Sequence, residues 1–234
     1  MKTLSRVIRA LAGMFYNAMF GGHDTWTRHV PTVMLLIEVV LVYYLLKFGG
    51  VWGFVAAFFP LIILHILSRS LHSMIYMLIV TSIPATWYFF TSLPFTRSIE
   101  ISLVGSLKAM SLGLWLLTTI FYFNPMEVSY LIYKLTKKTG LSLYLPLTWK
   151  MIPHTMRDLE NALLVNELKG ESSWVPLAVT LLTTREYEKL YIEGLWTKMS
   201  LFKPHFWYDK EAVILHSLLI AFLILHLLIF LNLI

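Results

Sequence analysis

Three ionisable side chains lie inside, or at the edge of, long apolar stretches of the sequence: Glu38, His65 and Lys108. A charge in hydrocarbon is costly, so such residues usually face the interior of a helix bundle or a partner, and they often belong to a relay or transport pathway. A pair between Glu38 and Lys108 is geometrically possible, because each lies within about two helical turns of the middle of its stretch. The alternative is that each side chain reaches toward the membrane surface or makes a structural polar contact.

The histidines are the second candidates for chemistry, since the chain has eight of them and no cysteine. His65 and His72 are seven residues apart and would share a helix face, but the Ser-Arg-Ser segment at 68–70 is expected to end the helix between them. His216 and His226 are ten residues apart, which is too far for one ion. No HExxH motif, carboxylate cluster or His–acid pair at i, i+4 accompanies these four histidines. We therefore expect structural histidines and neither a metal nor a cofactor.

The chain has none of the common sequence motifs for nucleotide binding or for a serine nucleophile. The sequence contains no Walker phosphate-binding loop, no GxSxG and no GxGxxG after a strand. If the function uses ATP, another subunit must bind it.

The composition shows which solvent surrounds these residues. The chain is 58% hydrophobic and only 14% charged, whereas soluble domains have about 25% charged residues. Lipid must therefore surround much of the chain. Five stretches have the length of roughly 17 to 25 residues that a membrane-spanning helix needs. The expected spans are Val30–Lys47, Val51–Leu67, Leu71–Phe90, Ile101–Phe123 and Val213–Ile234.

Glycine and proline residues are expected to cause turns and a kink in and between these spans. Gly49-Gly50 is predicted to form a tight turn, Pro60 to kink the second span, and Pro94 to lie in a loop. The N-terminal residues Met1–Arg9 are basic, and only a short, broken apolar stretch follows them, so no cleavable signal peptide is expected.

The segment 124–211 differs from the spans, because it holds 11 of the 19 Lys and Arg residues and 10 of the 13 acids. Its apolar residues nevertheless recur at helical spacing, which predicts amphipathic helices that need another apolar surface. One stripe comprises Met156, Leu159, Leu163 and Leu168, and a second comprises Tyr187, Leu190, Tyr191, Gly194 and Leu195. Helix stops are expected at Gly140 and Gly170, and starts or breaks near Pro146, Pro153 and Pro176.

The predicted fold is therefore an all-α polytopic membrane protein of about five transmembrane helices. Residues 1–123 form the N-terminal tail and four spans, residues 124–211 form three or four amphipathic helices against the membrane face, and residues 212–234 form the last span.

Positive charge predicts the orientation. With the N-terminal tail inside, four spans return the chain to the inside at Asn124. Five basic residues then join the 11 of the large segment on the cytoplasmic side: Lys2, Arg6, Arg9, Arg28 and Arg69. Only Lys47 and Arg97 remain outside, which is a strong positive-inside bias. We expect a multi-pass protein of the cell membrane whose N-terminus and amphipathic helices are cytoplasmic, and no nucleic-acid partner.

Two motifs in the segment 124–211 resemble those of a known family. Lys-Met-Ile-Pro at 150–153 opens a polar amphipathic helix that ends in Leu-Lys-Gly at 168–170. Val-Pro-Leu at 175–177 is followed by Glu-Gly-Leu-Trp at 193–196. This pattern is similar to the transmembrane T component of energy-coupling factor (ECF) transporters, the EcfT/CbiQ family. That family has an Arg-aromatic-Ile-Pro start and two helices that end in Ala-Arg-Gly.

The resemblance extends along most of the chain in order. Thr118-Thr119 with Asn-Pro-Met-Glu-Val at 124–128 is similar to the family's Thr-Thr-x-Pro-x-Glu-Leu stretch, and the Arg-His-Val-Pro-Thr segment at 28–32 fits its N-terminal pattern loosely. The chain departs from the family at both Ala-Arg-Gly sites. At the second one the acid is kept as Glu193, while the Arg is lost or shifted toward Lys198.

The resemblance implies a non-enzymatic transporter subunit whose two coupling helices are gripped by ATPases. It assigns Glu167, Lys169 and Gly170 to the first ATPase contact, and Glu193 and Lys198 to the second. Pro153, Arg157 and Pro176 would set the geometry of the coupling helices. Lys169 keeps the charge of the family's arginine but not its bidentate fork, so its pairing should be less directional.

The implied partners are two ATP-binding cassette ATPase subunits, a substrate-binding membrane S component and the lipid bilayer. The transported compound, a vitamin, metal ion or similar micronutrient, is chosen by the S component and stays open. The alternative from another class is a membrane-embedded metal-dependent enzyme with His65, His72, His154 and Glu127 as its candidates. A secondary transporter with its own substrate site is a third option, but the spans contain no convincing internal repeat.

Overall fold

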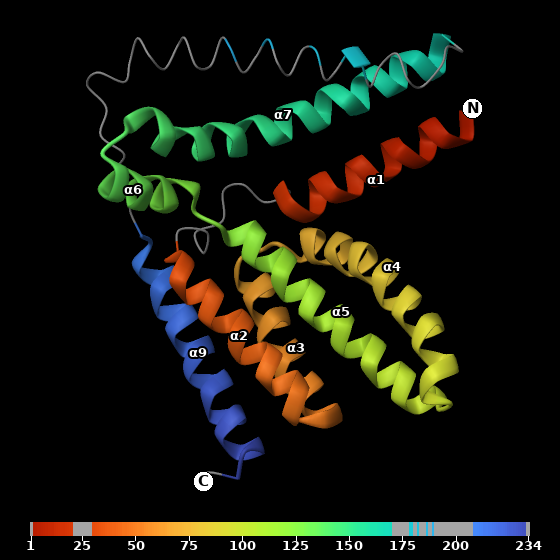
Figure 1. Ribbon diagram of the computed structural model, residues 1–234, viewed down its shortest axis with the longest axis vertical. Coiled ribbons are helices and arrows are strands. Elements are labelled where there is room, and N and C mark those ends of the chain that lie inside the picture. Colours follow the sequence, from red (N-terminus) through yellow and green to blue (C-terminus); the bar gives the residue numbers. More distant parts are fainter. Residues whose placement is uncertain are drawn as a thin grey trace. The chain divides into compact units, whose positions relative to one another are not determined.

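The computed structural model of the chain describes residues 2–20, 30–169 and 208–232, together with the single positions 178, 179, 182, 186 and 189. All elements in these residues are α-helices, as the sequence predicts, and none is a strand (Figure 1). In chain order the helices are α1 (Lys2–Phe20), α2 (Thr32–Phe48), α3 (Gly50–Leu67), α4 (Leu71–Thr96), α5 (Ile99–Tyr122), α6 (Pro125–Thr136), α7 (Thr139–Lys169) and α9 (Lys210–Phe230).

Four of these helices, α3, α4, α5 and α9, are long and apolar enough to cross a membrane. The protein is therefore membrane-embedded. The first predicted span corresponds to α2, whose 17 residues are at the short end of the roughly 17 to 25 residues that a span requires. The exact number of spans stays a prediction.

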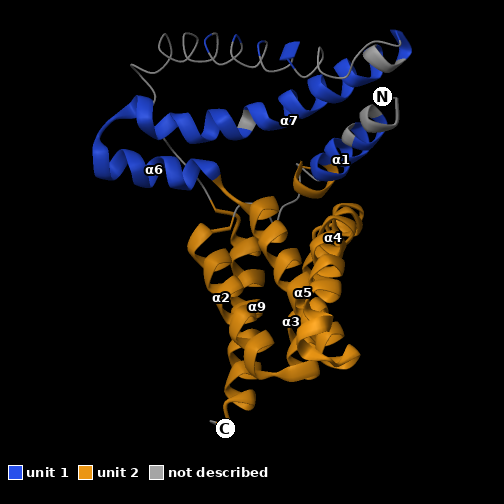
Figure 2. Ribbon diagram, turned by 45° about the vertical axis from the view of Figure 1, so that its right-hand side comes forward, with its two compact units in different colours: residues 1–16, 125–206 blue, residues 17–124, 207–234 orange. Residues whose placement is uncertain are grey.

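The chain divides into two compact units (Figure 2). Unit 1 comprises residues 1–16 and 125–206, and unit 2 comprises residues 17–124 and 207–234. Unit 2 contains the four candidate spans and α2, so it is the membrane-embedded bundle. In this bundle α2 lies beside α9, and α4 lies beside α5 (Figure 1).

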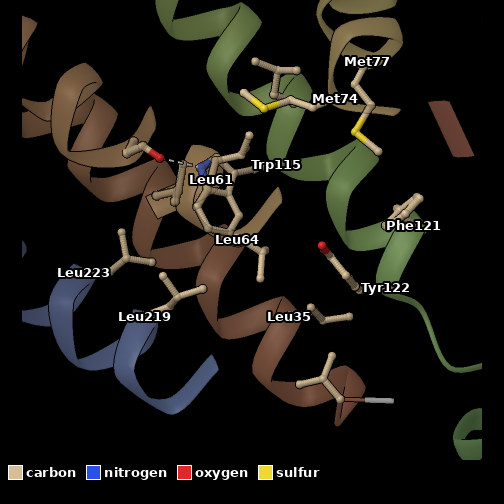
Figure 3. Packing of buried hydrophobic residues seen from close by; sticks show 14 of the residues in the cluster. Leu35, Leu61, Leu64, Met74, Met77, Trp115, Phe121, Tyr122, Leu219 and Leu223 are labelled. Carbon is tan, nitrogen blue, oxygen red and sulfur yellow. Dashed lines mark hydrogen bonds between the residues drawn. The ribbon is translucent and has the colours of Figure 1, made fainter. Parts of the chain in front are cut away.

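The core of unit 2 is built around Trp115 of α5, the largest fully buried side chain in the described residues (Figure 3). Leucines of α3 and α9 belong to the same cluster. The Trp115 Nε1–H donates a hydrogen bond of 2.8 Å to the carbonyl oxygen of Ala57, three residues before Pro60 inside α3. Because proline lacks an N–H and disturbs the preceding turn, groups from neighbouring helices often satisfy the carbonyls near it.

Two predicted turns of unit 2 are confirmed. Gly49 separates α2 from α3, and Gly50, the first residue of α3, has a φ of +55°, in the left-handed region that glycine adopts without strain. The segment 68–70 separates α3 from α4, and its central residue Arg69 has a φ of 54°. The loop predicted at Pro94 is wrong, because α4 continues through Pro94 to Thr96 and ends at a left-handed Arg97.

The predicted boundaries in the segment 139–169 are wrong as well. Gly140 is the second residue of α7 rather than a helix stop, and the left-handed residue between α6 and α7 is Lys137. α7 then runs without interruption through Pro146 and Pro153 to Lys169. A proline removes one backbone hydrogen bond and bends a helix, but the flanking turns of a long helix can continue on both sides.

Residues 2–20 form a helix that the sequence reading did not anticipate. Within unit 1, α6 lies beside α7, and residues 2–16 of α1 contact α7 through Arg157. The guanidinium of Arg157 lies over the Tyr16 ring, 4.9 Å from its centroid, and donates a hydrogen bond to the Tyr16 hydroxyl.

Candidate functional site

Glu38 and His216 form a buried acid–histidine pair. Glu38 projects from α2 and His216 from α9, and the Glu38 Oε1 lies 2.6 Å from the His216 Nδ1. Glu38 is 1% exposed and His216 is not exposed at all. Glu38 therefore pairs with His216 and not with Lys108, the pairing that the sequence left possible. α2 lies along α9, so the residue that reaches the Glu38 carboxylate comes from the end of the chain.

The other polar groups of the bundle gather around His65, near the end of α3. Its Nδ1 lies 2.7 Å from the Ser70 Oγ, and its Nε2 lies 3.2 Å from the Thr118 Oγ1 of α5. Both ring nitrogens are therefore engaged by neutral hydroxyl groups. A histidine held in this way joins two helices and has no nitrogen left for a metal ion.

Tyr122 connects these two parts of the bundle. Its hydroxyl donates a hydrogen bond of 2.7 Å to the Ser68 Oγ, which is itself hydrogen-bonded to Ser70. The Tyr122 ring also packs edge-on against the His216 ring, with centroids 5.7 Å apart. We call these seven residues the polar network: Glu38, His65, Ser68, Ser70, Thr118, Tyr122 and His216.

The polar network joins α2, α3, α5, α9 and the turn before α4 in a region where each member is 2% exposed or less. In such surroundings a hydrogen-bonded polar group is stable and an unpaired one is costly, so the network favours one arrangement of the helices. The His216 Nε2 is the exception, because it is buried and has no hydrogen-bond partner among the described residues.

The residues considered for a metal-dependent enzyme are not brought together. His72, in the first turn of α4, packs against the Tyr76 ring with centroids 4.9 Å apart. His154 is exposed on α7, and Glu127 is buried in α6. Across residues 2–20, 30–169 and 208–232 no three histidines or acids are close enough to hold a metal ion.

Lys108, the other predicted intramembrane charge, is half-exposed near the middle of α5. It makes no ion pair or hydrogen bond within the part of the chain that the structure describes.

The second group of candidate residues belongs to α7 in unit 1. This helix has 31 residues, which corresponds to about 46 Å at 1.5 Å per residue. Lys169 is its last residue, and its side chain is exposed, while the neighbouring Leu168 is 80% exposed. Leu168 was predicted on the same apolar stripe as Leu163, which is fully buried. A step of five residues turns a helix by about 140°, so the two side chains point in different directions.

Only some of the remaining residues predicted to set the coupling-helix geometry or to contact the ATPases lie among the residues that the structure describes. Pro153 is half-buried inside α7, and Arg157 contacts α1 as described above. The backbone of Glu167 lies in α7 but its side chain is outside the described residues. The following predicted site residues also lie outside the described residues: Gly170, Pro176, Glu193 and Lys198.

Several members of the polar network were not predicted from the sequence as a group. Ser68, Ser70, Thr118 and Tyr122 are common residue types, and only their position at the ends of apolar stretches was a signal. Comparison of the chain with protein-family models, with curated proteins and with solved structures gives no match.

Proposed function

We propose that this chain is the transmembrane coupling subunit of an ATP-driven importer of the energy-coupling factor type. In this role it transmits motion from two partner ATPases to a separate membrane protein that captures the substrate, a vitamin, metal ion or similar micronutrient. The chain itself hydrolyses no ATP. Its N-terminus and α7 lie on the cytoplasmic side, where the ATPases are.

One observation carries the proposal: α7 is a continuous helix that belongs to a different unit from the membrane bundle and ends in exposed residues. A helix of about 46 Å is stiff, so a displacement applied at Lys169 reaches its other end. Its surface at the C-terminal end combines the exposed Leu168 with the charged Lys169. An apolar anchor beside a cation suits a groove on a soluble partner.

The polar network supports the same role from the membrane side. A coupling subunit needs a bundle that moves as a body, because soft packing would absorb the displacement. Hydrogen bonds from Glu38 to His216 and from Tyr122 to Ser68 connect residues that are far apart in sequence. Buried networks of this kind make a helix arrangement specific.

Arg157 gives α7 a second support within unit 1. Its contact with Tyr16 joins the N-terminal helix to the middle of α7. We assign Pro153 and Arg157 to the geometry of the first coupling helix, and Glu167, Lys169 and Gly170 to the first ATPase contact. Glu193 and Lys198 are proposed for the second contact, with Pro176 before it.

Purification of the tagged chain from its native membranes in mild detergent tests this function. We expect two ATP-binding cassette ATPase subunits to be recovered with the chain, in amounts comparable to its own. The substitution Lys169→Glu should reduce this recovery at least tenfold, because it places a like charge where the partner is expected to present an acid.

Lys138→Glu is the matched control. Lys138 is also exposed, and it directly precedes α7 at the end opposite Lys169. The control should leave the recovery of the ATPases unchanged. Recovery of the wild-type chain without any ATPase, or an equal loss in the two variants, would contradict the proposed function.

A further inference from the structure

One face of α1 carries an apolar surface that is partly exposed. Val7, Leu11 and Phe15 follow one another at i, i+4 and i+8, so they form a stripe along one side of the helix. Their side chains are 51%, 37% and 38% exposed, respectively. We call these three residues the α1 stripe. It extends over about 12 Å.

The opposite side of α1 is the one that contacts α7. Tyr16 receives the Arg157 hydrogen bond, and a Cβ at Gly13 would lie 3.8 Å from the Glu160 Oε1. Arg9 lies on the same arc as these two residues by helical register. The α1 stripe therefore points away from α7, and its exposure is not a consequence of where α7 lies.

The helix also carries a marked charge pattern. Lys2, Arg6 and Arg9 are its only charged residues, and it contains no acid. By register the basic residues lie on the arc opposite the stripe. A helix with an apolar stripe on one side and cations on the other is typical of helices that lie in a membrane interface.

The C-terminal end of α1 leads into the membrane-embedded bundle. Residues from Asn17 onward belong to unit 2. Ala18 and Phe20 are 0% and 1% exposed, and Ala18 is part of the core cluster that contains Leu35 of α2. α1 is one continuous helix from Lys2 to Phe20, so the helix that carries the stripe is also the one that contributes Ala18 and Phe20 to the bundle.

From the stripe, the opposed cations and the buried last turn, we propose that α1 lies in the membrane interface. Val7, Leu11 and Phe15 enter the boundary between lipid headgroups and acyl chains. The occupant of this face is the bilayer itself. Apolar contact determines the depth of insertion, and attraction between the basic residues and anionic headgroups adds to the binding.

Site-directed spin labelling tests this inference on the full chain, which has no native cysteine. A nitroxide is attached to a single cysteine in Val7→Cys, in Leu11→Cys and in the control Arg6→Cys, whose position is exposed on the basic side. Each variant is placed in nanodiscs of phosphatidylcholine, with and without phosphatidylglycerol. Its collision rates with oxygen and with a water-soluble nickel complex are then compared.

We expect the ratio of oxygen to nickel accessibility to be several-fold higher at positions 7 and 11 than at position 6, in both lipid mixtures. Equal ratios at the three positions would place the stripe in water and overturn the inference. A stripe that is water-accessible in the isolated chain and shielded only when other subunits are added would assign it to a protein partner, and would also overturn it.

Two stripe positions are used so that a defect in one labelled variant does not decide the outcome. The readout needs no ATPase and no substrate. It therefore succeeds or fails independently of the proposed coupling function.

Discussion

Glu38 and His216 are 178 positions apart in the chain, yet the carboxylate oxygen of one lies 2.6 Å from the ring nitrogen of the other. The first helix of the bundle is thereby joined to the last. The residues between them include all of α6 and α7.

The first prediction concerns this pair. Glu38→Ala should destabilise the protein by about 2 kcal/mol, because it leaves the buried His216 ring with neither nitrogen paired. His216→Ala should cost a similar amount. Thermal unfolding in mild detergent measures both effects. The double variant should lose clearly less than the sum of the two single losses, since each removes the same interaction.

Glu100→Ala is the control for this cycle. Glu100 is exposed in the first turn of α5, so its loss should change stability by less than about 0.5 kcal/mol. Additive losses for Glu38 and His216 would show that the two side chains do not interact.

The second prediction concerns the centre of the polar network. Tyr122→Phe removes only the hydroxyl that donates to Ser68. The loss should be about 1 kcal/mol in the same unfolding measurement, because the buried Ser68 hydroxyl loses the hydrogen bond that Tyr122 donates. Tyr76→Phe is the matched control on α4, where the hydroxyl has no hydrogen bond to the described residues. Identical midpoints for both variants would contradict the assigned role of Tyr122.

The third prediction concerns the close approach of α2 and α3. A Cβ at Gly53 would overlap the Leu45 carbonyl oxygen, whereas a Cβ at Gly140 would meet nothing within 4 Å. Gly53→Ala should therefore lower the unfolding temperature, since backbone atoms must move apart to admit the methyl group. Gly140→Ala should be neutral or should stabilise α7 by up to about 1 kcal/mol. An unfolding temperature that is equal or higher for Gly53→Ala would contradict this geometry.

The fourth prediction concerns the support of α7 by α1. Cysteines at Gly13 and Glu160 in the cysteine-free chain should be joined efficiently by a short bifunctional maleimide. Arg157→Ala should reduce the yield strongly, because both the ring contact and the hydrogen bond to Tyr16 are lost. Arg157→Lys should give an intermediate yield, since a lysine keeps the cation over the ring but lacks the guanidinium fork.

Lys134→Ala provides the control for the cross-linking yield. Lys134 is exposed on α6 of the same unit, so the yield should stay at the wild-type level. The same yield in the wild type, Arg157→Ala and Lys134→Ala would mean that Arg157 does not hold α1 to α7.

The membrane helices could be predicted from the sequence because each one satisfies its backbone internally. In lipid an apolar stretch of sufficient length has no alternative to a helix, whatever its neighbours do. The turn at Gly50 was predictable for a similarly local reason, since glycine adopts a positive φ without strain. These features depend on residues within one or two helical turns.

The partners of the buried polar residues could not be predicted in the same way. Glu38 on α2 could face α5 or α9. Only the packing of the three helices makes His216 the partner of Glu38. The predicted helix ends near Pro94 and Gly140 were wrong for a different reason. Proline and glycine weaken a helix by limited amounts, and the turns around them carry enough hydrogen bonds to continue it.

Arg69, in the short connection between α3 and α4, affects both the stability of the folded protein and its insertion into the membrane. Its left-handed backbone costs about 1 kcal/mol for a residue with a side chain, and glycine would remove that strain. In the orientation proposed above, glycine would also delete one of the cations that favour a cytoplasmic position of this connection while the translocon inserts the nascent chain. A substitution that improves the finished fold would thus weaken the signal that orients it during synthesis.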